Sequence, residues 1–380
     1  MRIARVRAVG WRNLAPLDRV LDPLASLNVL YGQNAQGKTN LIEALYFAAT
    51  FRSFRTTQLA DLIGRDASEA RLTVAVETRD LHREVEVRLR REDGQEGCAV
   101  KRMIALDGKP VGRMSAVFGL VSLVLFVPED LLLARASPAA RRRFVDMAAA
   151  GISSGYLSET VTFQRVLKGR NALLRGGQAA TSPVWLDTLD EQLAAAGARL
   201  VMRRRAFVGD MAEPSQKFFR ALHAEIALEL AYESDPAVAE AASEDDVRSA
   251  LLAGLARRRA VDLRRRHTTF GPQTDDLVIR LGGRLAREHA SQGQLRSIML
   301  ALKLSELTLL ETARGESPVL LLDDVPSELD PLRRQFLFDT LSTLGCQTIL
   351  SVADRDVVPQ VRGRVDLEVE AGTIRSPLSV

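Results

Sequence analysis

The 380-residue sequence has little cysteine, few histidines and no long apolar run. Its two cysteines, Cys98 and Cys346, lie far apart in the sequence, so a disulfide framework is not expected and a reducing compartment is favoured. The four histidines are scattered without the spacing of zinc ligands. No segment approaches the roughly 20 apolar residues of a membrane-spanning helix, and the N-terminal segment lacks the apolar core of a signal peptide. These absences predict a cytoplasmic protein without a membrane partner.

The overall composition is that of an ordinary soluble globular chain, with 46% hydrophobic and 26% charged residues. Its length leaves room for a large core and, by the usual size of domains, for two domains. The net charge of +4 comes from 52 basic and 48 acidic residues. This excess is too small to predict nucleic-acid binding by itself, so local clusters of charge must decide the question.

The most informative segment is 27–40, with the sequence LNVLYGQNAQGKTN. It fills every fixed position of the phosphate-binding loop G-x-x-x-x-G-K-[ST] with Gly32, Gly37, Lys38 and Thr39. An apolar run at Leu27–Tyr31 precedes the loop as a buried strand would, and residues 40–50 follow it with helical spacing. A strand, a glycine-rich loop and a helix in this order predict a nucleotide site. The alternative is a glycine-rich turn that binds nothing.

The chemistry expected of this loop follows from its residue types. The glycines let backbone N–H groups face a triphosphate, and the next helix directs its positive dipole end at the same anion. Lys38 should reach the β- and γ-phosphates, and Thr39 should ligate Mg²⁺. We therefore expect ATP or GTP with Mg²⁺. The predicted nucleotide-binding residues of the loop are Gly32, Gln33, Asn34, Ala35, Gln36, Gly37, Lys38, Thr39 and Asn40.

Segments that alternate apolar and polar residues predict strands near the N-terminus. A half-buried strand is expected at 3–9, and the segments 71–79, 84–91 and 100–107 predict an antiparallel β-meander. The apolar run at 121–127 predicts another buried strand.

The middle of the chain, 156–267, reads as almost entirely helical, with a strand signal only at 225–232. Ser137-Pro138 and Ser182-Pro183 are typical helix starts, a capping hydroxyl followed by proline. An apolar seam repeats every seven residues and predicts an intramolecular helical hairpin or small bundle. Its members are Leu186, Leu193, Leu200 and Phe207, with Leu189 and Ala196 offset by three.

Three groups of arginines are candidate contacts for DNA phosphates. Two arginines follow the first predicted helix, three lie in the first two turns of the helix that begins at Ser137-Pro138, and six crowd 257–266 against the single Asp262. A solvated basic face is the alternative for each group. The predicted DNA-binding residues are Arg52, Arg55, Arg141, Arg142, Arg143, Arg257, Arg258 and Arg259.

Two further motifs lie in the C-terminal third. The first, Ser291-Gln292-Gly293-Gln294, opens an amphipathic helix whose start is a potential anion site. The second, at 318–324, is an apolar run that ends in Asp323 and Asp324, as a central parallel strand would. Asp323 suits the Walker B role at Mg²⁺ and Asp324 the role of hydrolytic base, unless the pair only caps a helix. Buried strands are expected at 347–352 and, at a sheet edge, 365–369.

The order of these motifs resembles ABC-type ATPases of the SMC class, and within that class the chain is similar to the RecF family along most of its length. Segments 10–14 (GWRNL), 128–146 (PEDLLLARASPAARRRFVD) and 321–337 (LLDDVPSELDPLRRQFL) carry the resemblance. Departures from the family pattern occur at Ala134, Ala136, Gln273 and Thr274. Ser351 and Asp354 stand where a transporter cassette has its switch histidine.

The resemblance implies an α/β fold, an ABC-type head with a parallel sheet and a β-meander, interrupted by a mostly helical arm. The expected head comprises 1–127 and 268–380, and the arm 128–267. It also implies that Arg12 and Asn13 contact the nucleotide, and that an ATP-dependent homodimer closes the motif at 291–294 of one subunit over the ATP of the other. Such a dimer would bind gapped or junction DNA, act with RecR and RecO to load RecA, and leave after hydrolysis. An SMC-like ATPase head with another role in DNA repair, a transporter cassette and a small-molecule kinase are the alternatives.

Overall fold

The computed structural model describes residues 1–22, 24–79, 81–92, 99–112, 114, 117–176 and 183–376. The chain divides into two units, which we call the head unit (Met1–Leu131 and Glu306–Val380) and the arm unit (Leu132–Ser305). The division falls within the 3₁₀ helix η3 (Pro128–Arg135) and within helix α8 (Gln292–Arg314).

The arm unit extends further along the chain than the predicted boundary after residue 267. Strand β10 (Asp276–Leu281) pairs antiparallel with β9 (Leu228–Glu233) and with β11 (Arg284–Leu285) in a three-stranded sheet. The sequence pattern assigns the alternating residues after 267 to the head, but this pairing groups them with the arm unit. The partner of an alternating segment is a distant strand, which periodicity alone does not identify.

The head unit contains a six-stranded, mainly parallel sheet. Strands β3, β12 and β13 follow the apolar runs expected from the sequence, and all are buried. Residues 365–369 are not an edge strand as predicted, because β14 pairs with β3 on one side and with β15 on the other. The order across the sheet is β15 (Thr373–Arg375), β14 (Arg364–Glu370), β3 (Leu27–Tyr31), β13 (Thr348–Val352), β12 (Val319–Asp323) and β8 (Leu123–Phe126).

A second sheet of the head unit is antiparallel, and its middle strands confirm the predicted β-meander. The short β2 and β7 had no clear periodic signal in the sequence. The order is β2 (Leu17–Val20), β1 (Arg2–Val9), β4 (Glu69–Glu77), β5 (His82–Glu92), β6 (Ala99–Leu106) and β7 (Lys109–Pro110).

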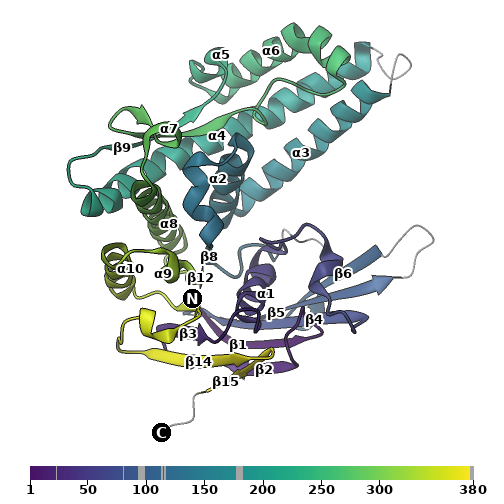
Figure 1. The fold of residues 1–380 in the computed structure, drawn as a ribbon. Helices are drawn as coiled ribbons and strands as arrows, with labels where there is room; N and C mark the ends of the chain where they lie inside the picture. The colour runs from purple at the N-terminus through teal and green to yellow at the C-terminus, as the bar shows by residue number, and fades with distance from the viewer. Residues whose placement is uncertain are drawn as a thin grey trace. The chain divides into compact units, whose positions relative to one another are not determined.

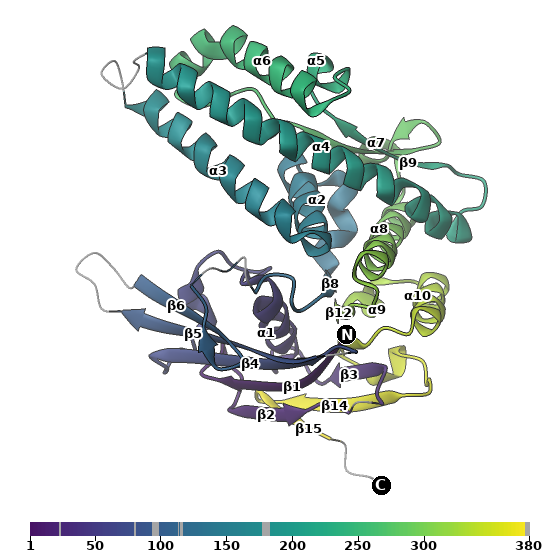
Figure 2. The same ribbon diagram turned by 180° about the vertical axis from the view of Figure 1, so that it is seen from behind.

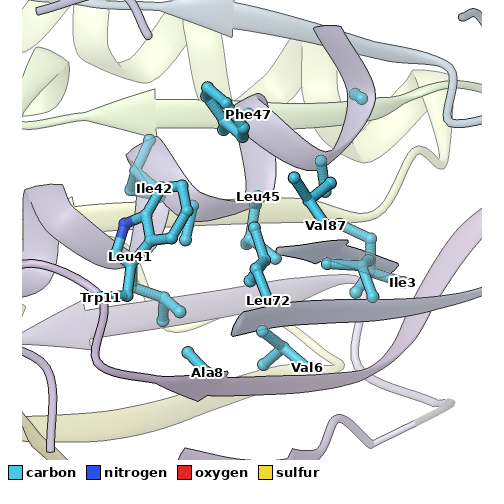
Figure 3. Packing of buried hydrophobic residues seen from close by; sticks show 14 of the residues in the cluster. Ile3, Val6, Ala8, Trp11, Leu41, Ile42, Leu45, Phe47, Leu72 and Val87 are labelled. Atoms are coloured by element: carbon cyan, nitrogen blue, oxygen red, sulfur yellow. The ribbon is translucent and has the colours of Figure 1, made fainter. Parts of the chain in front are cut away.

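Helix α1 (Lys38–Thr50) packs between these two sheets and contacts strands of both. Figure 3 shows its apolar side chains, among them Leu41 and Leu45, against Val6 and Leu72 of the antiparallel sheet. Trp11 is fully buried and makes an edge-to-face contact with Phe47, with 5.2 Å between the ring centroids. Burial on two sides anchors the helix that follows the phosphate loop. The other helices of the head unit are η1 (Leu59–Leu62), α9 (Val325–Glu328), α10 (Pro331–Leu344) and η5 (Arg355–Val357).

The arm unit is mostly helical, as the sequence predicts. Helix α4 packs against α3 and α6, and the three run side by side (Figures 1 and 2). The heptad seam of α4 is buried, with Leu186, Leu193 and Leu200 at most 3% exposed. Ser137 caps α2 through its side chain, whereas the cap expected at Ser182 lies outside the described residues. Besides the first part of α8, the described residues of this unit form the helices α2 (Pro138–Ile152), α3 (Ser154–Arg175), α4 (Pro183–Leu222), α5 (Pro236–Ala239), α6 (Glu244–Arg265) and α7 (Ala286–His289).

Candidate functional site

The predicted phosphate loop connects the carboxyl end of β3 to the first residue of α1. Gly32 and Gly37 have φ angles of 147° and 113°, conformations that residues with a side chain rarely adopt. A Cβ atom on Gly32 would lie 2.3 Å from the carbonyl oxygen of Val369. Both glycines of the motif are therefore required by the backbone path of the loop, which ends at a helix N-terminus, a favourable position for an anion.

Lys38 is 7% exposed and lies inside the loop. Its Nζ donates hydrogen bonds to the carbonyl oxygens of Gly32 (2.5 Å) and Gln33 (2.8 Å). Burial lowers the pKa of Lys38, and the nearby carboxylates of Asp324 and Asp323 oppose this effect. The ammonium group is thus held near the loop with few water contacts, where a phosphate would be a strong electrostatic partner.

Asp323, the last residue of β12, joins the second motif to the first. Its Oδ1 accepts hydrogen bonds from the hydroxyl groups of Thr39 (2.9 Å) and Ser351 (2.6 Å). Burial raises the pKa of Asp323, while these two hydrogen bonds lower it. A hydroxyl and a carboxylate in contact are oxygen ligands of the kind that Mg²⁺ uses together with substrate phosphates. The residues therefore fit the Mg²⁺ site predicted from the sequence.

Asp324 has a left-handed backbone conformation with φ of 52° and stands at the N-terminus of α9. Its side chain accepts a hydrogen bond from Ser327 (2.6 Å), and its N–H donates to Ser351. Non-glycine residues are uncommon in this conformation, and such strain often accompanies functional sites. Asp324 also faces the cavity beside Lys38, as a hydrolytic base would.

A cavity of about 700 Å³ opens beside the phosphate loop within the head unit. It brings together many of the predicted site residues, namely Arg12, Asn13, Asn34, Ala35, Gly37, Lys38, Thr39, Asn40, Arg55 and Asp324. The lining also includes residues that the sequence analysis did not select, namely Asp61, Ile63, Gly64, Arg65, Asp66 and Ser351. Segment 61–66 carries no motif, so only the fold identifies it as part of the site.

Arg12 is held by a carboxylate that the sequence analysis missed. Glu43 of α1 is fully buried and binds Arg12 through two hydrogen bonds of 2.8 and 2.9 Å. The hydroxyl of Ser53 donates to the same carboxylate (2.5 Å) and accepts the N–H of Arg55 (2.9 Å). An acidic residue within the otherwise apolar segment LIEALYFAA is the signal that could have revealed Glu43.

Polar side chains link the loop to its surroundings. Asn13 donates to the carbonyl oxygen of Ala35 (3.1 Å) and accepts from Asn40 (2.6 Å), while Arg55 donates to Asn40 (2.7 Å). Gln36 links the loop to the segment after β14. Its carbonyl and side-chain oxygens accept backbone N–H groups from residues 372 and 371, at 2.8 and 2.6 Å.

The motif at 291–294 belongs to the arm unit, at the start of α8. The hydroxyl of Ser291 accepts the N–H of Gln294 (3.2 Å), and the side chain of Gln294 accepts the N–H of Ser291 (2.8 Å). This reciprocal pair is a capping box. Ser291 and Gln292 are exposed, and Gly293 and Gln294 are partly exposed.

The arginines at 141–143 differ in their surroundings, and the prediction that all three contact DNA needs correction. Arg141 is 3% exposed and forms two hydrogen bonds with Asp276, at 2.8 and 2.5 Å. Its guanidinium is therefore occupied within the arm unit, and an internal carboxylate rather than an external anion neutralises it. Arg142 is partly buried and donates to the carbonyl oxygen of Asp275 (2.5 Å). Arg143 is exposed and stays a candidate.

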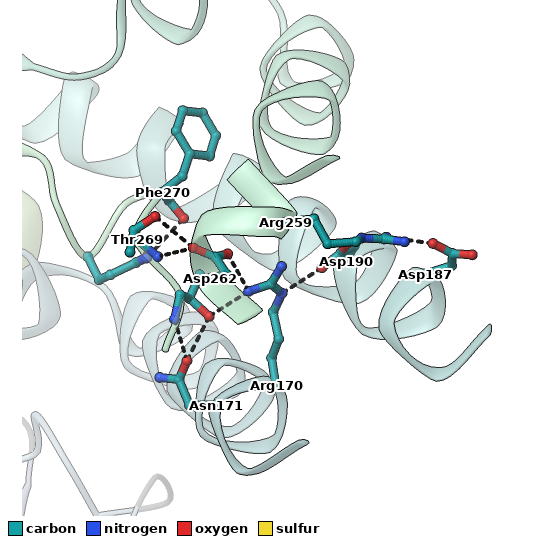
Figure 4. Close-up of polar contacts among 10 residues, drawn as sticks. Arg170, Asn171, Asp187, Asp190, Arg259, Asp262, Thr269 and Phe270 are labelled. Atoms are coloured by element: carbon teal, nitrogen blue, oxygen red, sulfur yellow. Dashed lines mark hydrogen bonds and ion pairs between the residues drawn. The ribbon is translucent and has the colours of Figure 1, made fainter. Parts of the chain in front are cut away.

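The arginines at 257–259 also differ, since one is bound by carboxylates of the arm unit and the other two are exposed. Arg259 donates to the carboxylates of Asp187 (2.5 Å) and Asp190 (2.7 Å) of α4. Figure 4 shows its side chain directed at these two residues. Asp190 also accepts from the fully buried Arg170 (2.6 Å). Arg259 therefore joins α6 to α4, which corrects its assignment as a DNA contact.

Besides Arg143, four of the predicted DNA-contact residues have exposed side chains. Arg257 and Arg258 are exposed on α6. Arg52 and Arg55 are exposed after α1, and Arg55 also lines the cavity.

A membrane contact was not expected from the sequence, and the described residues contain no helix long and apolar enough to cross a bilayer.

The comparisons with known proteins agree with this geometry. Residues 2–375 match the family described as the RecF/RecN/SMC N terminal domain. The chain is 38% identical over 382 residues to the "DNA replication and repair protein RecF" of Anaeromyxobacter sp. (strain Fw109-5), covering 100% of both chains. The protein of the same name from Myxococcus xanthus (strain DK1622) is 38% identical over 362 residues, 94% of this chain and 92% of that one.

Solved structures are similar over the whole chain as well. A structure described as the recombination mediator protein RecF-ATP in the RecFOR pathway superposes with a TM-score of 0.88, at 29% identity, over 98% of this chain and 97% of the other. An Smc head domain from Pyrococcus furiosus matches with a TM-score of 0.54 at 12% identity, over 98% of this chain and 95% of that chain, which supports the fold alone.

Proposed function

The chain belongs to the RecF family of DNA replication and repair proteins, and we propose that it is an ATP-dependent DNA-binding protein of recombinational repair. The observation that carries the proposal is the hydrogen bond between Thr39 and Asp323 beside the buried Lys38. It joins a complete phosphate loop to the carboxylates at the end of β12. A relative of 29% identity is described with ATP, which supports ATP rather than GTP as the nucleotide.

Within this site each residue has a defined task. Lys38 and the backbone N–H groups of the loop bind the β- and γ-phosphates, and Arg12 and Asn13, which also line the cavity, contact the nucleotide. Thr39 and Asp323 would hold Mg²⁺, which supplies positive charge against the phosphates. Asp324 accepts the proton of the attacking water as the bond between the β- and γ-phosphates breaks, which yields ADP and inorganic phosphate.

We further propose that ATP brings two copies together. In this dimer Ser291, Gln292, Gly293 and Gln294 of one subunit close over the ATP held by the other, and hydrolysis separates the subunits. The exposure of Ser291 at the N-terminus of a 23-residue helix supports an anion contact from outside the chain. An isologous dimer has two such composite sites, because each subunit offers both halves.

The DNA contacts that we propose are electrostatic and independent of sequence. They come from the accessible residues Arg52, Arg55, Arg143, Arg257 and Arg258. Single-strand/double-strand junctions of gapped DNA are the proposed target, and DNA would stimulate a weak ATPase activity. The protein would act in the cytoplasm with RecR and RecO to load RecA.

The test is the sedimentation coefficient of the protein with ATP or ADP, each with and without gapped DNA. An ATP-gated DNA clamp should form dimers with ATP, sediment with gapped DNA, and revert to monomers with ADP. A transporter-type cassette should dimerise irrespective of DNA, and a small-molecule kinase should ignore DNA altogether. A protein that stays monomeric and free of DNA with ATP would contradict the proposal.

A further inference from the structure

Ser351, at the carboxyl side of β13, makes contact with both carboxylate residues of the site. It is 1% exposed, and its hydroxyl donates to Oδ1 of Asp323 at 2.6 Å. The same oxygen accepts the N–H of Asp324 at 3.1 Å. A serine hydroxyl has a single proton, and the acceptor side here faces an N–H group, so the proton is directed at Asp323.

The position of Ser351 follows from the sheet. Asp323 and Ser351 are paired in register across the parallel strands β12 and β13. Side chains at paired positions of neighbouring strands lie on the same face, so a serine here meets the carboxylate directly. Thr39 donates to the same Oδ1 from α1, and the carboxylate is therefore oriented from two sides.

The backbone of Ser351 also holds Asp324. The N–H of Asp324 donates to the carbonyl oxygen of Ser351 at 3.0 Å in addition to the hydroxyl. Asp324 has the unusual φ of 52°, and a strained conformation persists only where its surroundings hold it in place. One residue thus constrains the direction of Asp323 and the backbone of Asp324.

We propose that Ser351 is a positioning residue that orients Asp323 toward Mg²⁺ and keeps Asp324 at the attacking water. The inference rests on the proposed function of this site as a Mg²⁺-dependent ATPase. Partners that orient a metal-binding carboxylate typically contribute 10- to 100-fold to metal affinity or activity. Binding of the nucleotide without metal depends on Lys38 and the loop and should not require Ser351.

The experiment compares Ser351→Ala and Ser351→Thr with the unaltered full-length chain. Mn²⁺ replaces Mg²⁺ in the binding assay, and electron paramagnetic resonance measures its affinity in the presence of AMP-PNP, independently of turnover. ATP hydrolysis is measured against Mg²⁺ concentration, and ATP affinity is measured with EDTA. Ser122→Ala is the matched control, because Ser122 is a buried serine of the head unit whose hydroxyl has no hydrogen-bond partner among the described residues.

We expect Ser351→Ala to bind Mn²⁺ about 10- to 100-fold more weakly and to need correspondingly more Mg²⁺ for hydrolysis, with metal-free ATP affinity unchanged. Ser351→Thr keeps the hydroxyl and should restore both values. Equal Mn²⁺ affinity in Ser351→Ala and the unaltered chain would overturn the inference, as would equal losses of metal-free and metal-dependent binding, which a merely structural role produces. If Ser351→Ala does not fold, Ser351→Cys takes its place under the same criterion, since a thiol is a weaker donor. Absence of ATPase activity in the unaltered chain would instead contradict the proposed function.

Discussion

The hydroxyl of Thr39 lies 2.9 Å from Oδ1 of Asp323, although 284 positions separate the two residues in the sequence. Thr39 is in the first turn of α1, and Asp323 ends β12. Parallel strands place their carboxyl ends at one edge of the sheet, so a loop after β3 and a carboxylate after β12 meet there. The phosphate loop and the carboxylates of β12 therefore form one nucleotide site in the head unit, and substitution of single residues can test each of its parts.

Replacing Lys38 by alanine should abolish measurable ATP binding. A hydrogen bond to a charged group contributes roughly 1.5–3 kcal/mol, so losing contacts to two phosphates should weaken binding by more than about 100-fold. Isothermal titration calorimetry with ATP measures the loss. Lys168→Ala, at an exposed lysine of α3, is the control and should bind normally. An affinity for ATP within a few-fold of the unaltered chain would show that Lys38 does not contact the phosphates.

Replacing Asp324 by asparagine should leave ATP binding intact but stop hydrolysis, because an amide cannot accept the proton of the attacking water at neutral pH. The protein should then remain an ATP-bound dimer, which size-exclusion chromatography with light scattering detects. Asp339→Asn, at an exposed position of α10, controls for the loss of a charge. Normal phosphate release by Asp324→Asn would mean that Asp324 is not the base.

The salt dependence of DNA binding should separate exposed arginines from those engaged in ion pairs. Each phosphate contact contributes roughly 0.7–0.9 to the slope of log affinity against log salt. Replacing Arg257 and Arg258 together by alanine should weaken binding and reduce the magnitude of the slope by about 1.4–1.8. Fluorescence anisotropy with gapped DNA at several salt concentrations measures both quantities.

The control for this experiment is Arg259→Ala. Arg259 is held by Asp187 and Asp190, so its loss should lower the melting temperature of the arm unit and leave the slope unchanged. An unchanged slope in the Arg257/Arg258 double variant would mean that this cluster faces solvent. Arg143, which is exposed on α2, would then be tested next.

Mixing two inactive variants should restore ATPase activity if the site is shared between subunits. A Lys38→Ala protein lacks the phosphate loop contact, and a Ser291→Arg protein blocks the opposing motif. A mixed dimer collects both defects in one site and leaves the other site intact. Equal mixing makes about half of the dimers mixed, so roughly a quarter of all sites regain native composition. Activity below that fraction would indicate that the two sites act together. The shared-site model fails if the mixture stays inactive while sedimentation shows that mixed dimers form with ATP.

The stability of the arm unit should depend on pH through Asp275. Burial raises the pKa of Asp275 from 3.8 to about 6, against the effect of hydrogen bonding from Tyr232. The folded state therefore binds this proton more tightly than the unfolded state. Protonated Asp275 therefore adds on the order of 2–3 kcal/mol to the free energy of unfolding at pH values below about 4. This stabilisation is lost as the pH rises through about 6.

Asp275→Asn tests this expectation, because an amide does not titrate and can still accept the hydrogen bond from Tyr232. The free energy of unfolding is measured with urea between pH 4.5 and 7.5 for both proteins. The variant should gain stability relative to the unaltered chain as the pH rises across this interval. Parallel pH profiles would show that Asp275 titrates at its ordinary value in the folded arm unit.

Local patterns in the sequence were sufficient to predict the strand, loop and helix that form the phosphate-binding part of the site. The phosphate loop, the strand β3 before it and the helix α1 after it follow from glycine positions, an apolar run and helical spacing. The meander and the capped start of α2 are likewise confirmed, since alternation and side-chain caps involve neighbouring residues. The resemblance to the RecF family added the division into a head and a helical arm.

Other features were decided by the tertiary structure, because they depend on residues that meet only after folding. The strand at 365–369 is internal since β15 pairs beside it, and residues after 267 group with the arm unit since β10 pairs with β9. Arg141 and Arg259 look like surface cations in the sequence, but distant carboxylates bind them.

At the nucleotide site, too, some residues could be predicted from the sequence and others were identified only by the fold. The sequence by itself determined which side chains could bind phosphate and Mg²⁺, because the loop motif and the apolar run ending in two aspartates are local signals. Only the fold brought Glu43 to Arg12 and Ser351 to Asp323, because a buried acid or serine in an element has no partner that its neighbours in the chain reveal. A buried polar group without a hydrogen-bond partner is energetically unfavourable, so Glu43 and Ser351 each need a partner. The order and register of the strands decide which partner each of them meets.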